Sequence, residues 1–299
     1  MRRAIVTGSS GFVGSALVPR IGVPVLPLPM GGADWVRRLE ACDFAGATVF
    51  HLAARVHRPG DGDEAAYHED NVEKTRRLAE AAAGGGAARL VFLSSIKVHG
   101  EESAAGHPLR PGDAPNPADP YARSKRDAEA ALRDISSGSA LSICIVRAPL
   151  VYGARARGNL RAMVRLADSP WPLPFASLAN RRSFVQVDDL ARLLLACGAS
   201  PAAHGATYLA AHPEPMSTAA LVARLRRALG RPERLYAVPA AWLEAGASLI
   251  GRRDAMLRLT RSLEADPSLA REQLGWEAQV GPEAAVAELA RASRDRGSA

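Results

Sequence analysis

The sequence is poor in lysine: only Lys74, Lys97 and Lys125 stand among its 38 basic residues, and the rest are arginines. The arginines are scattered along the chain rather than gathered on one stripe, which disfavours a nucleic-acid binder despite the net charge of +7. The positive balance still suits a substrate that carries phosphate. Where arginine is the usual cation, a lysine in a motif is less often incidental, because arginine does not readily replace a compact ammonium.

Cysteine and long apolar runs are scarce as well. The three cysteines, Cys42, Cys144 and Cys197, are far apart and form no C-x-x-C pair, so we expect reduced, buried thiols and no metal site. No run approaches the roughly 20 apolar residues of a membrane span. The apolar run near the start stops at Gly8, too short for a signal sequence. We therefore expect a cytoplasmic protein without a membrane span.

Apolar and helical segments alternate through the first half of the chain. This alternation predicts an α/β fold, a doubly wound parallel sheet of the Rossmann type. The expected strands lie at 3–7, 48–53, 89–94 and 141–146, and the expected helices begin near Gly14 or lie at 35–41, 69–83 and 121–135. Residues 107–120 contain five prolines and lead into Tyr121, so we expect this loop to shape the mouth of a site.

The second half mixes short strands and helices and predicts a smaller α/β lobe. Strands are expected at 183–187, 207–210 and 235–238, and helices at 159–167, after a cap at Ser217 or Thr218, and at 241–250, 253–262 and 268–274. We therefore expect a dinucleotide-binding domain at residues 1–153 and mainly a substrate lobe at 154–299. Residues 183–200 or so would return to the first domain.

Three glycines, Gly8, Gly11 and Gly14, follow the first expected strand and open a helix. In this context glycine lets the backbone approach a pyrophosphate, which the helix N-terminus stabilises. The alternative is a tight turn without a ligand. The sequence therefore predicts an NAD or NADP site. The residues between the glycines that would contribute to it are Ser10, Phe12 and Val13.

Tyr121 and Lys125 are four residues apart, so a helix places both on one face. A nearby ammonium favours the phenolate and lowers the pKa of the tyrosine, which yields a general base near neutral pH. Ser95 ends an expected strand of the same sheet, where open α/β sheets bind ligands. Such a Tyr-Lys pair also occurs by chance on helix surfaces, but Lys125 is one of three lysines. The set predicts hydride transfer at an alcohol or ketone carbon.

Six segments and one asparagine carry a family pattern in the right order. They are residues 7–14 (TGSSGFVG), 51–54 (HLAA), Asn71, 94–100 (SSIKVHG), Tyr121 to Lys125, 147–153 (RAPLVYG) and 181–190 (RRSFVQVDDL). With these segments the chain resembles the extended short-chain dehydrogenases/reductases of the NAD-dependent epimerase/dehydratase group. Residues 94–100 are most similar to a UDP-glucose 4-epimerase-like subgroup, which also contains reductases of UDP-4-keto-6-deoxy-N-acetylhexosamines.

The resemblance implies a role for each residue of the expected catalytic set. Tyr121 would exchange the proton of a sugar hydroxyl, and Ser95 would hydrogen-bond the same oxygen. Lys125 would hold the nicotinamide ribose and lower the tyrosine pKa, while Asn71 would support the lysine through its backbone and water. Further cofactor contacts implied by the family follow later strands: Leu52, Ala53, Ala54 and Pro149.

The resemblance also implies that the second lobe holds a nucleoside diphosphate. Asn159 and Arg182 resemble phosphate contacts and Phe175 a nucleobase contact, and Arg182 suits bidentate phosphate binding. Lys97 is a further candidate for contact with substrate. Three of these residues have simpler alternatives: a helix cap for Asn159, a surface arginine for Arg182 and a solvated loop lysine for Lys97.

Two departures from the family pattern narrow the reaction and the cofactor. Family dehydratases carry an acidic pair directly after the catalytic Ser or Thr, and Ile96 and Lys97 stand there instead, which argues against 4,6-dehydration. The second strand has no carboxylate or basic residue for the adenosine ribose. Pro19 interrupts the helix before it, and the nearest acid, Asp34, comes late. The choice between NAD and NADP stays open.

These observations predict an NAD(P)-dependent oxidoreductase that acts at C4 of a UDP-linked hexose or N-acetylhexosamine. It would be a 4-epimerase or a 4-keto-sugar reductase in the synthesis of polysaccharide precursors. The alternative is a non-catalytic, NAD(P)-sensing Rossmann protein, against which intact Ser95, Tyr121 and Lys125 argue. Homodimers are common in the family, which makes a homodimer one further expectation.

Overall fold

A single parallel sheet organises most of the molecule. The computed structural model describes residues 1–56, 62–156 and 159–295. Six strands are hydrogen-bonded in the order β2-β1-β3-β4-β5-β8, and every neighbouring pair is parallel. They are β1 (Ala4–Thr7), β2 (Val25–Pro27), β3 (Thr48–His51), β4 (Arg89–Ser95), β5 (Ser142–Ala148) and β8 (Thr207–Leu209).

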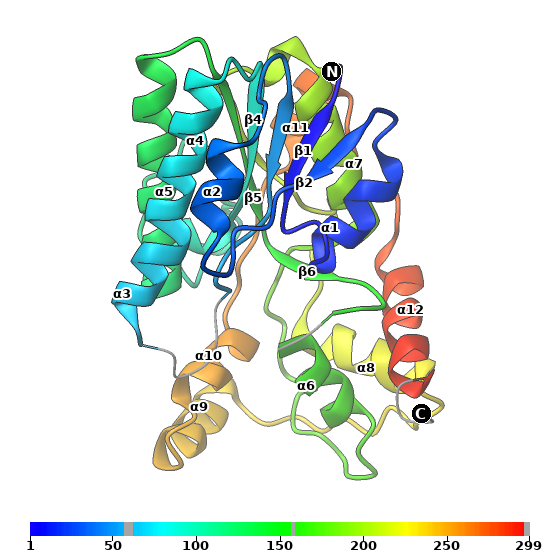
Figure 1. Cartoon of the computed structure of the whole chain (residues 1–299). Coiled ribbons are helices and arrows are strands. Elements are labelled where there is room, and N and C mark those ends of the chain that lie inside the picture. Colours follow the sequence, from blue (N-terminus) through cyan, green and yellow to red (C-terminus); the bar gives the residue numbers. More distant parts are fainter. Residues whose placement is uncertain (57–61, 157–158, 296–299) are drawn as a thin grey trace.

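Helices cover both faces of this sheet, as Figure 1 shows. One face carries α2 (Trp35–Glu40), α4 (Lys74–Gly84) and α5 (Pro120–Ser137); the other carries α1 (Phe12–Leu17), α7 (Val187–Ala199) and α11 (Ser268–Leu274). Strands covered on both faces read as continuous apolar runs, which is how they stood out in the sequence. The predicted doubly wound parallel sheet is therefore confirmed.

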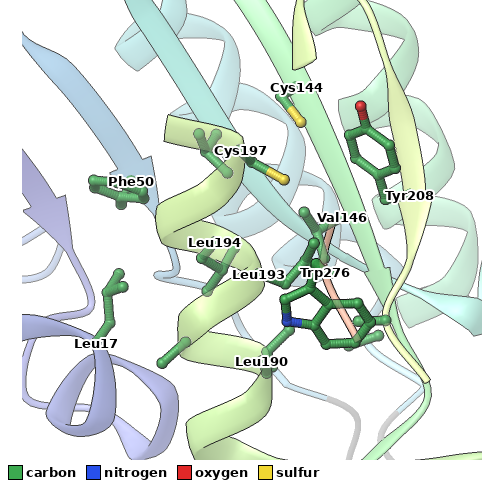
Figure 2. Close-up of a cluster of buried hydrophobic side chains, with 14 of the residues drawn as sticks. Leu17, Phe50, Cys144, Val146, Leu190, Leu193, Leu194, Cys197, Tyr208 and Trp276 are labelled. Atoms are coloured by element: carbon green, nitrogen blue, oxygen red, sulfur yellow. The ribbon is translucent and has the colours of Figure 1, made fainter. Parts of the chain in front are cut away.

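The alternation of side chains along each strand divides the interior into two cores. In β1, Ala4 and Val6 face the layer of α1 and α7, and Ile5 faces the layer of α4 and α5. Figure 2 shows the first of these cores, where leucines of α7 pack on the sheet and Trp276, the residue that follows α11 and its C-cap glycine, lies beside Leu193 and Val146. The C-terminal part of the chain, through α11 and Trp276, therefore helps to cover this face of the sheet.

The three cysteines are free, as expected, but they differ in burial. Cys144 and Cys197 are fully buried in the core beneath α7 (Figure 2). Cys42 is only half-buried, so the expectation of a buried thiol is wrong at that position. It follows α2 and packs against the edge of the second core, the one that lies under α4 and α5.

A smaller lobe lies below the carboxyl end of the sheet in Figure 1. Its two strands, β6 (Leu150–Tyr152) and β7 (Phe184–Gln186), pair in parallel. Its helices are α6 (Asn159–Ala167), α8 (Thr218–Ala228), α9 (Ala240–Leu249), α10 (Arg253–Thr260) and α12 (Pro282–Asp295). A third apolar core joins β6 and β7 to α6, α8 and α12. No helix in the described part of the chain has both the length and the apolar character needed to cross a membrane.

The lobe differs from the sequence prediction in three places. Within residues 183–200, β7 belongs to the lobe and only α7 packs on the main sheet. β8 joins that sheet beside β5 and α11 packs on it, so the return to the first domain begins after β7 and reaches beyond residue 200. Residues 235–238 form no strand, because only Leu235 makes a bridge, to Leu173. The helix α12 was not predicted. The cap of α8 is Ser217, whose hydroxyl accepts the N–H of Ala220 at 3.0 Å.

The first half follows the prediction more closely, with one irregular helix. α1 stops at Leu17 and a 3₁₀ turn, Val18–Arg20, contains Pro19, so the shortened helix and the short β2 are confirmed. The helix expected at 69–83 consists of a π-helical segment, η2 (His68–Glu73), and α4, and a further short helix, α3 (Glu64–Tyr67), precedes them. π-helical turns are frequent at functional sites. Two further 3₁₀ turns are Ile96–His99 and Pro201–Ala203.

Candidate active site

Ser95 and Tyr121 meet at the carboxyl edge of the sheet. Ser95 is the last residue of β4, and Tyr121 is the second residue of α5. Asp119 caps α5, since its Oδ1 accepts the N–H of Ala122 at 2.7 Å. Pro120 occupies the first helical position, where a backbone N–H would have no partner within the helix, so its absence costs nothing. The side chains of Ser95 and Tyr121 are hydrogen-bonded to each other. The structure thus brings these two predicted residues together.

The pKa of Tyr121 moves in the direction opposite to the one predicted. Burial raises it to about 12, and this outweighs the lowering by the hydrogen bond with Ser95. The reason lies in where the ammonium of Lys125 is held: its Nζ donates to the carbonyl of Leu93 at 2.8 Å and lies 4.2 Å from the centre of the Phe92 ring. Helical spacing alone therefore does not make Tyr121 a base.

Lys125 is itself strongly perturbed. Burial lowers its pKa to about 7, partly offset by the carboxylate of Glu129. The side chain then changes charge near neutral pH. A hydrogen-bond acceptor or an anion brought to the Nζ atom favours the ammonium form, so the charge at this position responds to what binds there.

Asn71 lies in the π-helical segment η2 and holds two parts of the site together. Its Oδ1 accepts the N–H of Arg55 at 2.8 Å, and its Nδ2 donates to the carbonyl of Arg55 at 3.0 Å and to Ser124 Oγ at 2.9 Å. Ser124 precedes Lys125 on α5. The asparagine therefore fixes the loop after β3 against the helix that carries Tyr121, while its implied support of Lys125 remains a prediction.

A buried chain of hydrogen bonds under the loop after β3 was not predicted. The hydroxyl of Thr75 donates to the carbonyl of Asn71 at 2.7 Å, so its oxygen accepts the Nε2–H of His51 at 2.8 Å. The Nδ1 of His51 then accepts the hydroxyl of Thr7 at 2.6 Å, and the Thr7 oxygen accepts the N–H of Ala53 at 3.2 Å. Burial lowers the pKa of His51 to about 3, which keeps the ring neutral as this chain requires.

The glycine turn after β1 fits a dinucleotide. Gly8 has φ +68°, and a Cβ there would lie 2.8 Å from the backbone nitrogen of Ala53; a Cβ on Gly14 would lie 2.2 Å from the carbonyl oxygen of Gly8. Both positions therefore require glycine. Ser10 and Gly11 are exposed at the tip of this turn, so bare backbone faces outward beside the start of α1.

The other expected cofactor contacts border the same edge of the sheet. Leu52, Ala53 and Ala54 follow β3 and are half-buried next to the glycine turn. Pro149 follows β5 and is buried. The residues present thus fit a dinucleotide laid across the carboxyl ends of β1, β3, β4 and β5.

At the end of β2, the structure places a charged group that was not predicted. The guanidinium of Arg38, on α2, donates to the carbonyl oxygens of Pro29 (3.3 Å) and Gly31. Asp34 lies at the N-terminus of α2, seven residues beyond the end of β2, and its side chain makes no capping bond there. The basic group of Arg38 therefore lies against the loop that follows β2.

Arg182 lies in the lobe next to a second arginine. It is half-buried, its Nη1 donates to the carbonyl of Arg261 at 3.1 Å, and its backbone bridges Met216. Burial lowers the pKa of Arg182; Glu101 raises it and Arg258 lowers it further. The charge of Arg258, on α10, is thus felt at Arg182, and the two guanidinium groups make this part of the lobe suited to an anion. Arg258 carried no signal in the sequence.

The other three expected substrate residues have different surroundings. Lys97 Nζ lies 2.5 Å from Asp119 Oδ2 and 2.7 Å from Glu101 Oε1, so it joins the cap of α5 to the loop after β4 rather than standing free in solvent. Phe175 is 4% exposed and packs in the core of the lobe. Asn159 is the first residue of α6, but its side chain lies outside the described part of the chain.

A buried ion pair anchors α5 to the sheet beneath the site. Glu129, one turn beyond Lys125, accepts from Ser94 Oγ at 2.6 Å and from Arg147 at 2.6 and 3.0 Å. Arg147 also donates to His99 Nε2 at 2.8 Å, and burial and the Arg147 charge lower the pKa of His99 to about 4. The ion pair therefore holds α5 against β5, and the hydrogen bond from Ser94 holds the same helix against β4, the strand that ends in Ser95. Sequence reasoning missed it, although Arg147 opens one of the family segments.

A doubly wound sheet with a glycine turn after β1, and a serine, tyrosine and lysine at β4 and α5, defines a short-chain dehydrogenase/reductase. The sequence model of the NAD dependent epimerase/dehydratase family matches residues 30–211. The UDP-glucose 4-epimerase of Vibrio cholerae is 33% identical to this chain, and the alignment covers 91% of this chain and 90% of the relative. The UDP-glucose 4-epimerase of Mycolicibacterium smegmatis is 29% identical, and the alignment covers 93% of this chain and 94% of that relative. The chain belongs to the NAD-dependent epimerase/dehydratase family.

Solved structures agree with this assignment. MoeE5 in complex with UDP-glucuronic acid and NAD superposes with a TM-score of 0.77 at 25% identity, and the match covers 98% of this chain and 99% of that one. The protein is therefore an extended short-chain dehydrogenase/reductase, an enzyme that uses NAD or NADP.

Proposed function

We propose that the protein is a 4-epimerase of a UDP-linked hexose or N-acetylhexosamine. The observation that carries this proposal is the hydrogen-bonded pair of Ser95 and Tyr121 at the end of β4, with Lys125 one turn further along α5. The relative from Vibrio cholerae, a UDP-glucose 4-epimerase, supports it because the similarity spans nearly the whole of both chains. The ligand of MoeE5, UDP-glucuronic acid, is a UDP-sugar of the same kind.

The chemistry of the protein's own residues starts from a protonated phenol. NAD, when bound, supplies a hydride acceptor and a positive charge. Tyr121, with a pKa raised to about 12, holds its proton until positive charge nearby lowers that pKa. Its oxygen then takes the proton of the C4 hydroxyl and later returns it, while Ser95 hydrogen-bonds the same sugar oxygen.

The lobe has a separate task in an epimerase. Both faces of C4 must be presented in turn, so the sugar has to rotate while the rest of the substrate stays bound. Arg182, with Arg258 near it, is the part of the lobe suited to hold a diphosphate during that rotation. Holding the diphosphate rather than the sugar leaves the ring free to turn.

A 4-keto-sugar reductase is the second candidate, and one observation favours it. The guanidinium of Arg38, on α2, is hydrogen-bonded to the loop that follows β2, whereas the nearest carboxylate, that of Asp34, comes only at the start of α2. An arginine there is typical of NADP binding, and a reductase exchanges its cofactor at every turnover. The catalytic residues would be the same.

The first experiment is denaturation of freshly purified protein and mass spectrometry of the nucleotide that it releases. Near-stoichiometric NAD supports the epimerase, whose cofactor stays bound through the reaction. A preparation without nucleotide that takes up added NADPH overturns the epimerase in favour of the reductase. Failure to bind either nucleotide would overturn both in favour of a non-catalytic protein.

The role of Tyr121 is tested by Tyr121→Phe. We expect interconversion of UDP-glucose and UDP-galactose, or of their N-acetyl forms, to fall by about 10² to 10⁴ while NAD binding stays nearly unchanged, since only the proton carrier is lost. Tyr236→Phe is the control, because that tyrosine is exposed in the lobe. Turnover retained by Tyr121→Phe would refute the mechanism.

A further inference from the structure

The helix α9 turns an apolar stripe outward. Trp242, Ala245, Gly246 and Leu249 are spaced i, i+3, i+4 and i+7 and are all exposed. The large side chains are extreme: Trp242 is 72% exposed, Leu249 89%, and Ile250, which follows the helix, 71%. Solvent-facing helix surfaces normally carry charged and polar residues, and a contiguous exposed apolar patch marks an interaction site.

The other side of α9 is already used by the protein. Leu243 packs into the third core and Ala247 is buried. The one charged residue of the helix, Glu244, accepts a hydrogen bond from the hydroxyl of Thr260 on α10 at 2.6 Å. The helix is therefore held in place by its inner face, and its outer face has no charge of its own.

Positive charge stands directly beside this apolar stripe. Arg252 and Arg253 are exposed where the chain turns from α9 into α10, shortly after Leu249. Within the described ranges neither guanidinium forms an ion pair. Figure 1 shows α9 and α10 at the end of the lobe remote from the sheet, where a flat surface can reach them.

Tryptophan, leucine and isoleucine beside arginines match the chemistry of an anionic membrane surface. The indole and the aliphatic side chains suit the boundary between headgroups and acyl chains, and each arginine near the surface is attracted to anionic lipid. A second copy of the chain fits less well. A standard dimer interface takes about 20–30 residues a side, and this stripe is one exposed side of a ten-residue helix.

We propose that α9 and the turn to Arg253, here called the α9 tip, dock this enzyme onto the surface of an anionic lipid bilayer. Trp242, Leu249 and Ile250 enter the headgroup boundary, and Arg252 and Arg253 contact lipid phosphates. Because α10 also carries Arg258, docking brings the diphosphate region of the lobe close to the membrane. The docking surface stands apart from the catalytic residues and does not depend on which sugar is converted.

The test is flotation of the full-length protein with vesicles of equal parts phosphatidylglycerol and phosphatidylcholine. We expect the protein to float with these vesicles and not with phosphatidylcholine alone. The variant Leu249→Ser with Ile250→Ser should weaken binding by more than about tenfold, because it removes two side chains that enter the boundary. Both are exposed, so its melting temperature should equal that of the wild type.

Charge is tested separately with matched variants. Arg252→Glu with Arg253→Glu should abolish flotation with anionic vesicles. Arg2→Glu with Arg37→Glu changes the net charge by the same amount at exposed positions outside the lobe, and flotation with anionic vesicles should stay unchanged.

Three results would overturn the proposal. The first is wild-type protein that does not float with the anionic vesicles. The second is an equal loss of flotation in the two charge variants. The third is a wild-type dimer that dissociates in the variant Leu249→Ser with Ile250→Ser, which would show that a second copy covers the stripe. Turnover of UDP-sugars in solution is measured on the same preparations. A protein that floats but converts no UDP-sugar keeps the docking surface and refutes only the proposed reaction.

Discussion

The buried ion pair of Glu129 and Arg147 offers the sharpest test of how the catalytic helix is held. The side chains of Glu129 and Arg147 are 1% and 3% exposed. Glu129→Gln keeps the shape of the side chain but removes its charge and replaces one acceptor oxygen by a donor. Ser94 Oγ and Arg147 Nε donate to one carboxylate oxygen and Arg147 Nη2 donates to the other, so an amide, which keeps a single oxygen, cannot accept all three bonds.

Breaking a buried ion pair by changing one partner costs about 3–5 kcal/mol, because the other charge stays buried without compensation. The retained amide oxygen places Glu129→Gln at the lower end, about 3 kcal/mol in the free energy of unfolding. For a chain of this size that corresponds to a loss of about 5–10 °C in melting temperature. Turnover should fall as well, because α5 carries Tyr121 and Lys125 against the strand that ends in Ser95.

The assay is urea unfolding followed by circular dichroism and tryptophan fluorescence. The matched control is Glu80→Gln, which removes an exposed ion pair with Arg76 (2.7 Å) on α4 and should cost no more than about 0.5 kcal/mol. If Glu129→Gln destabilises the protein no more than Glu80→Gln does, the ion pair is not what anchors α5. The same conclusion follows if the stability falls but turnover is unchanged.

Two further predictions concern the glycine turn and the buried histidines. Gly14→Ala places a Cβ 2.2 Å from the Gly8 carbonyl and should cost about 1–3 kcal/mol and weaken NAD binding in calorimetry, whereas Gly22→Ala meets nothing within 4 Å and should do neither. His51 and His99 have pKa values lowered to about 3 and 4 in the folded protein. Below about pH 6.5 these histidines therefore bind protons in the unfolded chain but not in the folded one, and the free energy of unfolding decreases as the pH is lowered. Urea unfolding at pH 7 and pH 5 measures this; equal stability at the two pH values would contradict it.

The sequence predicted elements well where local signals decide them. The helices expected at 159–167 and 268–274 have those bounds in the structure, and the interruption at Pro19 is confirmed. Element bounds depend on caps and on periodicity within a few residues. The place of β8 depends instead on a strand order set by contacts far apart in sequence, so residues 207–210 were recognised as a strand and assigned to the wrong part.

The same distinction separates the parts of the site. The glycine turn, Ser95 and the Tyr121–Lys125 pair are short motifs, and the structure assembles them at one edge of the sheet. The partners of Glu129 and His51 come from other strands and helices, so no spacing in the chain reveals them. Buried polar groups need partners, but a sequence shows the need only after burial is known.

The pKa of Tyr121 shows most directly why spacing was not enough. Four residues along a helix bring two side chains to the same face, but the direction of a long lysine side chain is set by what it can bond. Here the carbonyl of Leu93 and the ring of Phe92 hold the ammonium, and burial raises the phenol pKa while lowering that of Lys125 to about 7. Burial disfavours the charged form of each group. Positive charge or hydrogen-bond donors near the phenol reverse the first shift, and negative charge or acceptors near the amine reverse the second. The protein's own residues therefore keep the phenol neutral and leave the amine only partly protonated near pH 7, and the base is formed only together with the ligands that the site recognises.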